Sequence, residues 1–391
     1  MNDPSLFERL RALPCGQRLL DVAAGQDGVH LVGGAVRDLL LGREPRELDV
    51  VVEGDIDALA TRLGAVQTAH GRFGTATVAQ GACRWDLAAA RAEDYARPGA
   101  LPEVRSAGID EDLRRRDVTI NAIALELASG ALRAVEHARA DLDARRLRVL
   151  HDASFIDDPT RLWRIARYAA RLGFTLEPHT AKLAAEAVAA GVAERVSGAR
   201  IGNELRLALT EPDPVAAIER AVALGLAPWL RADRPTTAAA LELLPVGEGR
   251  ADLVVLAAAL DESPDDADQR LAGLDFTAAE RAVLRAAARA PALAAAAADA
   301  QRPSQLARAL RGQPVEAVAL AGASGAAEPV RRWLGELRHV ALRIDGDDLL
   351  AAGVPRGPQI GRLLAATLER RLDGELGDDQ GEQLAAALAA G

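Results

Sequence analysis

The residues that first indicate chemistry lie in the stretch 31–54 (LVGGAVRDLLLGREPRELDVVVEG). Gly33 and Gly34 follow an apolar run and precede a short helical pattern with Arg37 in its first turn. Glycines at a strand-to-helix turn let backbone N–H groups approach a ligand closely, and a guanidinium pairs well with phosphate oxygens. These residues predict a phosphate-binding turn, although a Gly-Gly pair after a strand is often no more than a turn.

Two carboxylates, Glu47 and Asp49, lie where the next apolar run begins. Side chains two residues apart on a strand leave on the same face, and adjacent carboxylates repel each other unless a cation lies between them. Their hard oxygen atoms suit Mg²⁺. Asp86 lies in another expected strand, where it either completes a three-carboxylate metal site or faces outward at an edge. The alternative for the acidic pair is a solvated position at a strand start.

A second pair, Asp158 and Arg161, opens the helical pattern 157–173 (DDPTRLWRIARYAARLG). CTP and ATP both present an amino donor beside an unprotonated ring nitrogen, whereas UTP and GTP present a carbonyl beside an N–H. A carboxylate acceptor next to a guanidinium donor therefore accepts C and A and rejects U and G. The alternative gives Asp158 only a helix-capping role before Pro159, which would occupy one carboxylate oxygen, and leaves the arginines in water.

The segments around these residues predict the elements that position them. Apolar periodicity and turn residues predict helices over 6–24 and 56–63 and strands over 29–32, 48–52, 75–79 and 84–88. The Pro- and Gly-rich stretch 93–108 predicts a flexible surface loop, and 109–125 predicts an amphipathic helix. From residue 157 onward nearly every segment has helical spacing, so a mixed head of about 145 residues precedes an all-helical remainder.

Composition excludes several classes of protein. The 391 residues can bury a large core, and no apolar run of about 20 residues or signal-peptide pattern occurs, which favours a cytoplasmic protein with no membrane partner. Two cysteines support neither a zinc site nor a disulfide framework. The net charge of −10 requires any RNA contact to use a local basic groove.

The stretch 31–54 resembles the signature of class II nucleotidyltransferases, the family of bacterial tRNA CCA-adding enzymes and poly(A) polymerases: GGxVRD, a short helix, then DxD. Glu47 stands where the family usually has Asp. Residues 109–125 (IDEDLRRRDVTINAIAL) resemble the family's DL-RRDFTINA motif. This implies that Arg116 contacts the nucleotide's phosphates and that Asp112 and Asp117 support the sugar and the local structure; the alternative is three solvated arginines with Asp117 paired to one of them.

Residues 157–173 resemble the family's EDxxR motif, with Asp157 in place of Glu. The resemblance implies that Asp158 and Arg161 read the base and that Arg164 and Arg167 line the same pocket. Residues 199–209 resemble a further motif, which is expected to support the base-reading helix, and residues 344–364 resemble the family's tail motif.

The resemblance implies an α+β N-terminal nucleotidyltransferase head, a small mixed sheet with helices, followed by an all-α neck, body and tail. The expected boundaries are 1–145, 146–210, 211–340 and 341–391. The implied activity is template-independent addition of C and A from CTP and ATP to the 3′ end of tRNA by two-metal transfer. Glu47 and Asp49, with Asp86, would hold Mg²⁺. Alternatives are an A-adding or CC-adding tRNA enzyme, a poly(A) polymerase, or a degenerate RNA- or nucleotide-binding protein.

Overall fold

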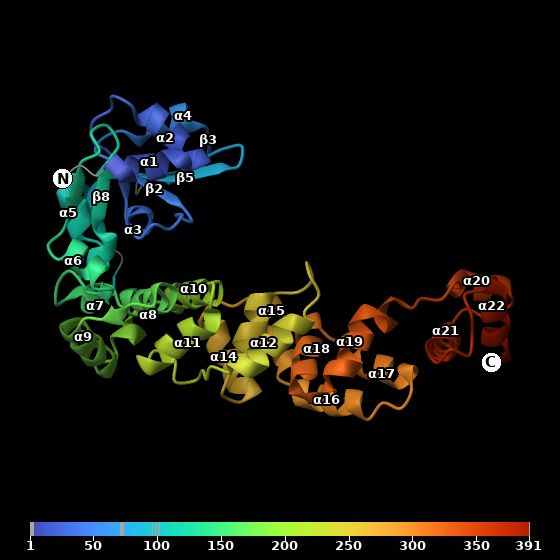
Figure 1. Cartoon of the computed structure of the whole chain (residues 1–391). Helices are drawn as coiled ribbons and strands as arrows, with labels where there is room; N and C mark the ends of the chain where they lie inside the picture. Colours follow the sequence, from blue (N-terminus) through green and yellow to red (C-terminus); the bar gives the residue numbers. More distant parts are fainter. Residues whose placement is uncertain (1–3, 71–73, 96, 98, 101, 391) are drawn as a thin grey trace. The chain divides into compact units, whose positions relative to one another are not determined.

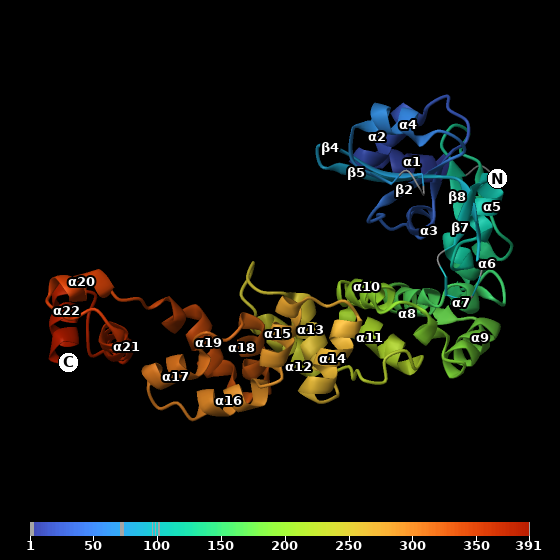
Figure 2. The same ribbon diagram turned by 180° about the vertical axis from the view of Figure 1, so that it is seen from behind.

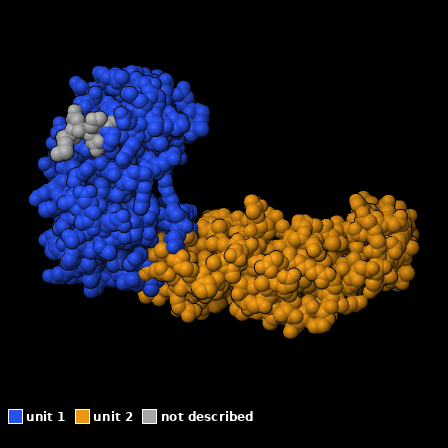
Figure 3. All heavy atoms as spheres, viewed as in Figure 1, with its two compact units in different colours: residues 1–213, 220–227 blue, residues 214–219, 228–391 orange. Residues whose placement is uncertain are grey.

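Figure 1 shows the computed structural model of the chain, which describes residues 4–70, 74–95, 97, 99–100 and 102–390. The chain divides into two compact units, coloured separately in Figure 3. The first contains residues 1–213 and 220–227, and the second contains residues 214–219 and 228–391. The finer division into head, neck, body and tail stays a prediction.

The first unit is built on a seven-stranded mixed sheet with the strand order β3-β4-β5-β2-β1-β8-β9. β2 and β5 are parallel, and their antiparallel neighbours β1 and β4 flank them; β4 and β5 lie side by side in Figure 2. The strands are β1 (Val29–Val32), β2 (Leu48–Val52), β3 (Ala65–His70), β4 (Thr75–Gln80), β5 (Cys83–Ala89), β8 (Ile123–Glu126) and β9 (Leu132–Ala134). The expected mixed sheet is confirmed, while β3, β8 and β9 were not expected.

Helices cover one face of this sheet. α1 (Pro4–Ala12), α2 (Pro14–Ala23), α3 (Gly34–Leu40) and α4 (Ile56–Leu63) pack with apolar strand residues in one core. The single helix expected over 6–24 is wrong, because Leu13 is extended and Pro14 starts a new helix. The limits expected for α4 are confirmed: Asp55 accepts a hydrogen bond from Asp57 N, and Gly64 caps the end.

The opposite face of the sheet carries polar side chains. Along β2, Leu48, Val50 and Val52 belong to the helix-covered core, whereas Val51 belongs to a separate apolar cluster. Because successive side chains alternate across a strand, Asp49 lies on the same face as Val51, away from the helices. The sheet therefore exposes its carboxylates on the face that α1, α2 and α4 leave open.

The helix expected over 109–125 is wrong beyond its first turns. α5 spans only Ile109–Arg114, Thr119–Asn121 forms a 3₁₀ turn, and the following residues form β8. Val118 pairs with Val149, and β8 pairs with β1 through His30–Val32. Strand pairing with β1 thus outweighs the helical spacing of the sequence.

The loop expected over 93–108 is also wrong at its two ends. β6 (Arg91–Asp94) and β7 (Glu103–Ser106) form a two-stranded antiparallel sheet. Residues 96, 98 and 101, which fall in the expected loop, lie outside the described residues.

Helices complete the first unit. α8 (Thr160–Leu172) buries the expected apolar stripe and ends at Gly173, whose φ of 68° suits glycine. The other elements are α6 (Ala138–Asp143), β10 (Arg146–Leu147), α7 (Ser154–Asp157), β11 (Thr175–Leu176), α9 (Pro178–Ala189), a 3₁₀ turn (Val192–Arg195) and α10 (Gly198–Leu209).

The second unit is helical throughout its described residues. It comprises part of α11 (Pro214–Ala223), then α12 (Arg234–Leu243), α13 (Ala251–Ala259), α14 (Pro264–Gly273), α15 (Ala278–Ala287), α16 (Ala290–Ala298), α17 (Pro303–Leu310), α18 (Val315–Ala321), α19 (Ala327–Gly335), a 3₁₀ turn (Leu337–His339), α20 (Gly346–Ala351), α21 (Pro358–Leu372) and α22 (Gln380–Ala389). A π-helical turn (Gly322–Ala326) links α18 to α19. No helix among the described residues is long and apolar enough to span a membrane.

The two cysteines, from which no bond was expected, form a disulfide. Cys15 in α2 is bonded to Cys83 at the start of β5, across a sequence separation of 68 residues. The indole of Trp85 donates a hydrogen bond to the carbonyl of Cys15 at 3.1 Å, so α2 is attached to β5 by two kinds of bond.

Candidate active site

Strand pairing brings the three predicted carboxylates together. Asp49 in β2 is the register partner of Asp86 in β5, and Glu47 lies two residues before Asp49. One carboxylate oxygen from each residue lies within 4.8 Å of the others. No other group of three potential metal-binding side chains of this kind was found within the described ranges. The geometry therefore matches the three-carboxylate alternative for Asp86.

The carboxylate cluster is only partly compensated by positive charge. Glu47 and Asp49 accept no hydrogen bond from any described residue, whereas Asp86 accepts hydrogen bonds from Thr77 Oγ1 at 2.6 Å and from the exposed guanidinium of Arg84 at 3.4 Å. Burial, followed by the charge of Glu47, raises the pKa of Asp49 to about 6, against weaker lowering by Arg116. A divalent cation bound to these oxygens would relieve the repulsion, so the cluster fits a hard metal ion.

The glycine turn faces this cluster. Gly33 ends β1 with a φ of 66°, a conformation that L-residues with side chains rarely adopt. A Cβ at Gly33 would lie 2.7 Å from Nη1 of Arg116, so a side chain there would displace that guanidinium from its present position. Gly34 begins α3. Arg37 lines the same cleft but is 2% exposed.

Arg37 is already engaged by protein groups. Its Nη1 donates to Asn121 Oδ1 at 2.7 Å, and its Nε donates to Asp38 Oδ1 at 2.9 Å. These bonds fix the guanidinium beneath the turn, on the cleft wall. The structure therefore places Arg37, the residue predicted to bind phosphate, in the cleft wall. Its hydrogen bonds to Asp38 and Asn121 were not indicated by the sequence.

Asp112 positions two arginines beside the turn. Its buried carboxylate accepts hydrogen bonds from Arg115 at 2.8 Å and from Arg116 at 2.9 Å. Burial is the largest single influence on the pKa of this carboxyl, and it acts to raise that pKa. The two guanidiniums together outweigh burial and lower the pKa of Asp112. Both oxygens of Asp112 already accept hydrogen bonds from these arginines. Asp112 therefore orients Arg116 and has no oxygen left for direct contact with a ligand.

The predicted base-reading residues lie at the junction of α7 and α8. Asp158 Oδ1 accepts hydrogen bonds from the backbone N–H and the hydroxyl of Thr160, at 3.1 and 2.7 Å, and from Arg200 Nη2 at 2.8 Å. Oδ2 of Asp158 has no hydrogen-bond partner among the described residues. The N-cap of α8 is Pro159 and not Asp158 as expected. Thr160 and Arg200 nevertheless occupy one oxygen of Asp158 and leave the other.

Arg161 is held more tightly than the sequence indicated. Its side chain is 4% exposed, Nη1 donates to Ser154 Oγ at 2.7 Å, and Nη2 donates to the carbonyl of Arg115 at 2.8 Å. Both terminal nitrogens therefore have protein partners. Because each carries two N–H groups, Nη2 can still donate to a base while it keeps its bond to the Arg115 carbonyl.

The remaining predicted residues form a charge network behind the cleft. Arg164 pairs with Asp117 at 2.7 Å, and Tyr168 donates to the same carboxylate at 2.8 Å. Burial opposes ionisation of Asp117, but Arg164, Tyr168 and Asn121 together hold the pKa of that carboxyl well below its usual range. Asp117 therefore pairs with Arg164 of α8, and not with one of the arginines at 114–116 as the alternative interpretation suggested.

Arg167 and the motif at 199–209 belong to this network too. Arg167 donates to Glu204 at 2.7 Å and to Glu211 at 3.1 Å. Arg200, expected to support the base-reading helix, also donates to the carbonyl of Gly99 at 3.0 Å. It therefore contacts Asp158 directly and is more than a remote scaffold.

Most of these residues line one cleft of about 730 Å³ within the first unit, a volume typical of small-molecule sites. Asp86 lines an adjoining pocket that shares Asp49 and Arg116 with the cleft, whereas Asp112 and Arg200 line neither. Sequence reasoning missed several lining residues. Arg171 could have been inferred from its spacing one turn after Arg167, while Glu211, buried under both, gave no signal before the fold was known. The cleft is lined by Gly33, Gly34, Arg37, Arg46, Glu47, Asp49, Glu93, Tyr95, Arg115, Arg116, Asp117, Asn121, Asp158, Arg161, Arg164, Arg167, Tyr168, Arg171, Glu204 and Glu211 among others.

Comparison with known proteins adds to this geometry. Residues 29–148 match the model of the poly A polymerase head domain. The chain is 36% identical over 385 residues to an A-adding tRNA nucleotidyltransferase of Geobacter sulfurreducens, covering 89% of this chain and 43% of that protein. It is 43% identical over 203 residues to a CC-adding tRNA nucleotidyltransferase of Deinococcus radiodurans, covering 49% and 52%. The chain therefore spans about half the length of these curated relatives.

Solved structures match nearly the whole chain. A CCA-adding enzyme in an apo form superposes with a TM-score of 0.81 at 29% identity, covering 99% of this chain and 96% of the other. A Thermotoga maritima CCA-adding enzyme complexed with tRNA superposes with a TM-score of 0.76 at 28% identity, covering 100% and 98%.

A mixed sheet with clustered carboxylates beside a glycine turn defines a nucleotidyltransferase-type head. Residues 29–148 match the poly A polymerase head domain, and the relatives and solved structures that resemble the chain are named as tRNA nucleotidyltransferases and CCA-adding enzymes. The family resemblance and the fold class expected from the sequence are confirmed.

Proposed function

We propose that this chain is a template-independent nucleotidyltransferase that adds C and A, from CTP and ATP, to the 3′ end of tRNA. The observation that carries the proposal is the joining of two kinds of chemistry in one cleft. The carboxylates of Glu47 and Asp49 lie on one wall, and Asp158 and Arg161 lie on another. The relatives named above support the reaction class.

Glu47, Asp49 and Asp86 would hold two Mg²⁺ ions. The shared proximity of their oxygens and the raised pKa of Asp49 support this assignment. When bound, the metal would lower the pKa of the primer's 3′-hydroxyl and stabilise the leaving pyrophosphate.

The triphosphate would lie against the glycine turn. Gly33 leaves space for the Arg116 guanidinium, and Asp112 keeps that guanidinium oriented. Arg37 contributes a fixed positive charge behind Gly34. Fixed donors of this kind bind phosphate without paying for reorganisation at each turnover.

The base would be selected by hydrogen-bond polarity. The free Oδ2 of Asp158 accepts from the exocyclic amine of cytosine or adenine, and Arg161 donates to the adjacent ring nitrogen. In uracil or guanine, a carbonyl would face the Asp158 carboxylate, acceptor against acceptor. The adjacent N–H would face the Arg161 guanidinium, donor against donor. The same pair therefore serves CTP and ATP and does not distinguish between them.

The experiment that tests this function uses tRNA transcripts that end before CCA, after C and after CC, each offered one nucleotide at a time with Mg²⁺. Addition of C to the first two transcripts and of A to the third is the expected pattern. Incorporation of UTP or GTP, or no incorporation with any transcript, would contradict the proposal.

A-addition alone is the second candidate, because the Geobacter relative, similar over most of this chain, is named as A-adding. In the same experiment that enzyme would extend only the transcript ending in CC. A CC-adding enzyme would stop before A, and a poly(A) polymerase would add A repeatedly to any of the three.

Glu47 motivates a non-catalytic candidate. It is longer by one methylene than the Asp usual in the family, and Mg²⁺ requires near-ideal ligand geometry. Binding of CTP and ATP without incorporation, at every Mg²⁺ or Mn²⁺ concentration, would identify a nucleotide-binding protein instead.

A further inference from the structure

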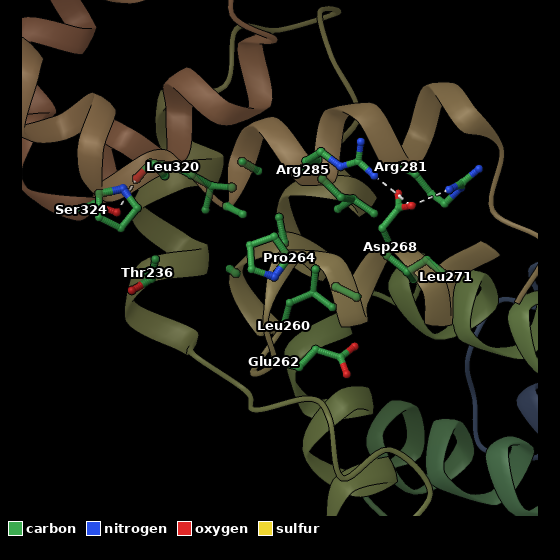
Figure 4. Close-up of a pocket in the computed structure, with 18 residues that line it drawn as sticks. Thr236, Leu260, Glu262, Pro264, Asp268, Leu271, Arg281, Arg285, Leu320 and Ser324 are labelled. Carbon is green, nitrogen blue, oxygen red and sulfur yellow. Dashed lines mark hydrogen bonds and ion pairs between the residues drawn. The ribbon is translucent and has the colours of Figure 1, made fainter. Parts of the chain in front are cut away.

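A second cavity lies in the helical second unit, away from every residue assigned above. It has a volume of about 310 Å³, at the lower end of the range for small-molecule sites. Its walls come from α12, α13, α14, α15, α16 and α18 and from the π-helical turn (Figure 4). Nothing in the proposed reaction uses this cavity.

The middle of the cavity is apolar. Two thirds of its lining residues are aliphatic, and alanines on α13, α15 and α16 leave space where larger side chains would close it. Figure 4 shows Leu260 and Pro264 in this middle part. Such a surface favours a hydrocarbon or aromatic body.

One end of the cavity carries uncompensated positive charge. Asp268 accepts from Arg281 at 2.8 Å and from Arg285 at 2.9 Å, so a single carboxylate serves two guanidiniums. Nε of Arg281 is buried without a hydrogen-bond partner in the described part of the chain. Glu262 does not supply the missing negative charge, because Arg270 already binds it at 2.9 Å.

Hydroxyl groups lie at the other end. Ser324, in the π-helical turn, donates to the carbonyl of Leu320 at 2.8 Å, and Thr236 donates to Asp233 at 2.8 Å. Figure 4 shows Ser324 and Thr236 on the side opposite the Asp268 cluster. The chain kinks beside Ser324, because Gly325 has a non-helical φ of 119° between α18 and α19.

We propose that this cavity binds a small organic monocarboxylate, with its apolar body between the helices and its carboxylate at Arg281 and Arg285. A cationic ligand would add to the positive charge at that end. A neutral apolar ligand would leave that charge uncompensated, whereas a carboxylate supplies both the charge and the missing acceptor. The inference does not depend on the proposed nucleotidyl transfer, because the two sites share no residue.

Calorimetric titration of the full chain with 3-phenylpropionate and with octanoate tests the proposal. Saturable binding of at least one acid with one site per chain is expected, and 3-phenylpropanol, which has the same body without the charge, should bind about tenfold more weakly than 3-phenylpropionate. Absence of saturable binding of both acids to the wild-type chain would overturn the proposal.

Two variants locate the binding. Ala258→Leu fills the cavity at a partly exposed wall position and should abolish binding. Arg285→Met removes one guanidinium whose side chain is 58% exposed, so folding should be preserved, and binding should weaken about tenfold. Arg331→Met removes an equally exposed guanidinium outside the cavity and is the matched control.

Each outcome decides the matter. Equal binding by Ala258→Leu and the wild type would place the ligand elsewhere and refute the site. Equal affinities of Arg285→Met and Arg331→Met would refute the charge argument. If circular dichroism shows that Ala258→Leu is unfolded, the comparison of the two arginine variants decides alone.

Discussion

Two carboxylates on the sheet, Glu47 and Asp49, line the same cleft as the proposed base-reading pair, Asp158 and Arg161, yet the two pairs are stabilised in opposite ways. Glu47 and Asp49 have no hydrogen-bond donor among the described residues, and burial raises the pKa of Asp49 to about 6. Asp158 and Arg161, by contrast, have protein partners for one carboxylate oxygen and for both terminal guanidinium nitrogens.

This difference assigns different requirements to the two walls. The carboxylate wall is electrostatically incomplete and needs a cation to hold its geometry. The wall proposed to read the base is largely held by protein partners before any nucleotide binds, and Oδ2 of Asp158 is the acceptor left for a base. Only the surplus of new hydrogen bonds over those already present contributes to affinity. Substitutions in the carboxylate wall should therefore change the rate and its metal dependence. Substitutions in the other wall should change nucleotide discrimination, with smaller effects.

The largest effect is expected from Asp49→Ala. Removing the carboxylate that lies between Glu47 and Asp86 should lower kcat for nucleotide addition at least about 10³-fold, because metal binding and charge stabilisation are lost together. The variant should fold normally, since it removes buried repulsion. A single-turnover assay with tRNA checks the rate, and an active Asp49→Ala enzyme would refute the metal assignment.

Arg161→Met should act on selectivity. Without the guanidinium donor, kcat/KM for CTP and ATP should fall about tenfold or more, while UTP and GTP lose little, so that discrimination narrows. Competition between nucleotides on one tRNA measures the ratio. Arg139→Met, an exposed arginine of α6, is the control; unchanged discrimination in Arg161→Met would remove the base-reading role.

Thr77→Val probes the orientation of Asp86. The substitution preserves shape but removes the hydroxyl that donates to Asp86 at 2.6 Å. We expect kcat to fall about tenfold and the Mg²⁺ concentration for half-maximal rate to rise, with the nucleotide KM unchanged. Thr77→Ser should restore both values. A Thr77→Val enzyme with wild-type metal dependence would show that Asp86 needs no such support.

Ser154→Ala tests whether Arg161 must exchange partners. The hydroxyl accepts from Arg161 Nη1, so its loss should free that nitrogen and lower the KM for both CTP and ATP about fivefold. An increased KM would mean that Ser154 holds Arg161 in its working position. Thermal unfolding of the variant shows whether the small cavity left by the hydroxyl matters.

The smallest effect is expected from Glu47→Asp. Because the Glu47 side chain is exposed and one methylene longer than Asp, shortening it should keep kcat or raise it a few-fold. The reaction rate measured as a function of Mg²⁺ concentration compares the wild-type chain with the Glu47→Asp variant. A loss of activity in Glu47→Asp would show that the cluster in this chain is built around the longer side chain.

Much of the catalytic wall could be predicted from the sequence. The two-residue spacing of Glu47 and Asp49 determines that both side chains leave one face of a strand, whatever the rest of the fold does. The glycine turn could be predicted in the same way, because Gly33 and Gly34 are adjacent in the sequence. The position of Asp86 opposite Asp49 depends instead on which strand pairs with β2, and spacing alone does not contain that pairing.

The base-reading wall was less predictable. The bonds from Thr160 to Asp158 are local in sequence. The partners of Arg161 include the backbone of Arg115, which only the tertiary fold brings close. The helix expected over 109–125 failed for a related reason, since its second half gains more by pairing with β1 than by continuing a helix.

The parallel alignment of β2 with β5 makes the assembly of the site inseparable from the folding of the sheet. Side chains alternate every residue, so a slip of one position in either strand would turn one acidic side chain toward α1, α2 and α4, where aliphatic residues are packed. If the proposed activity holds, it requires the observed register between β2 and β5, and a compact molecule with a shifted register would be inactive.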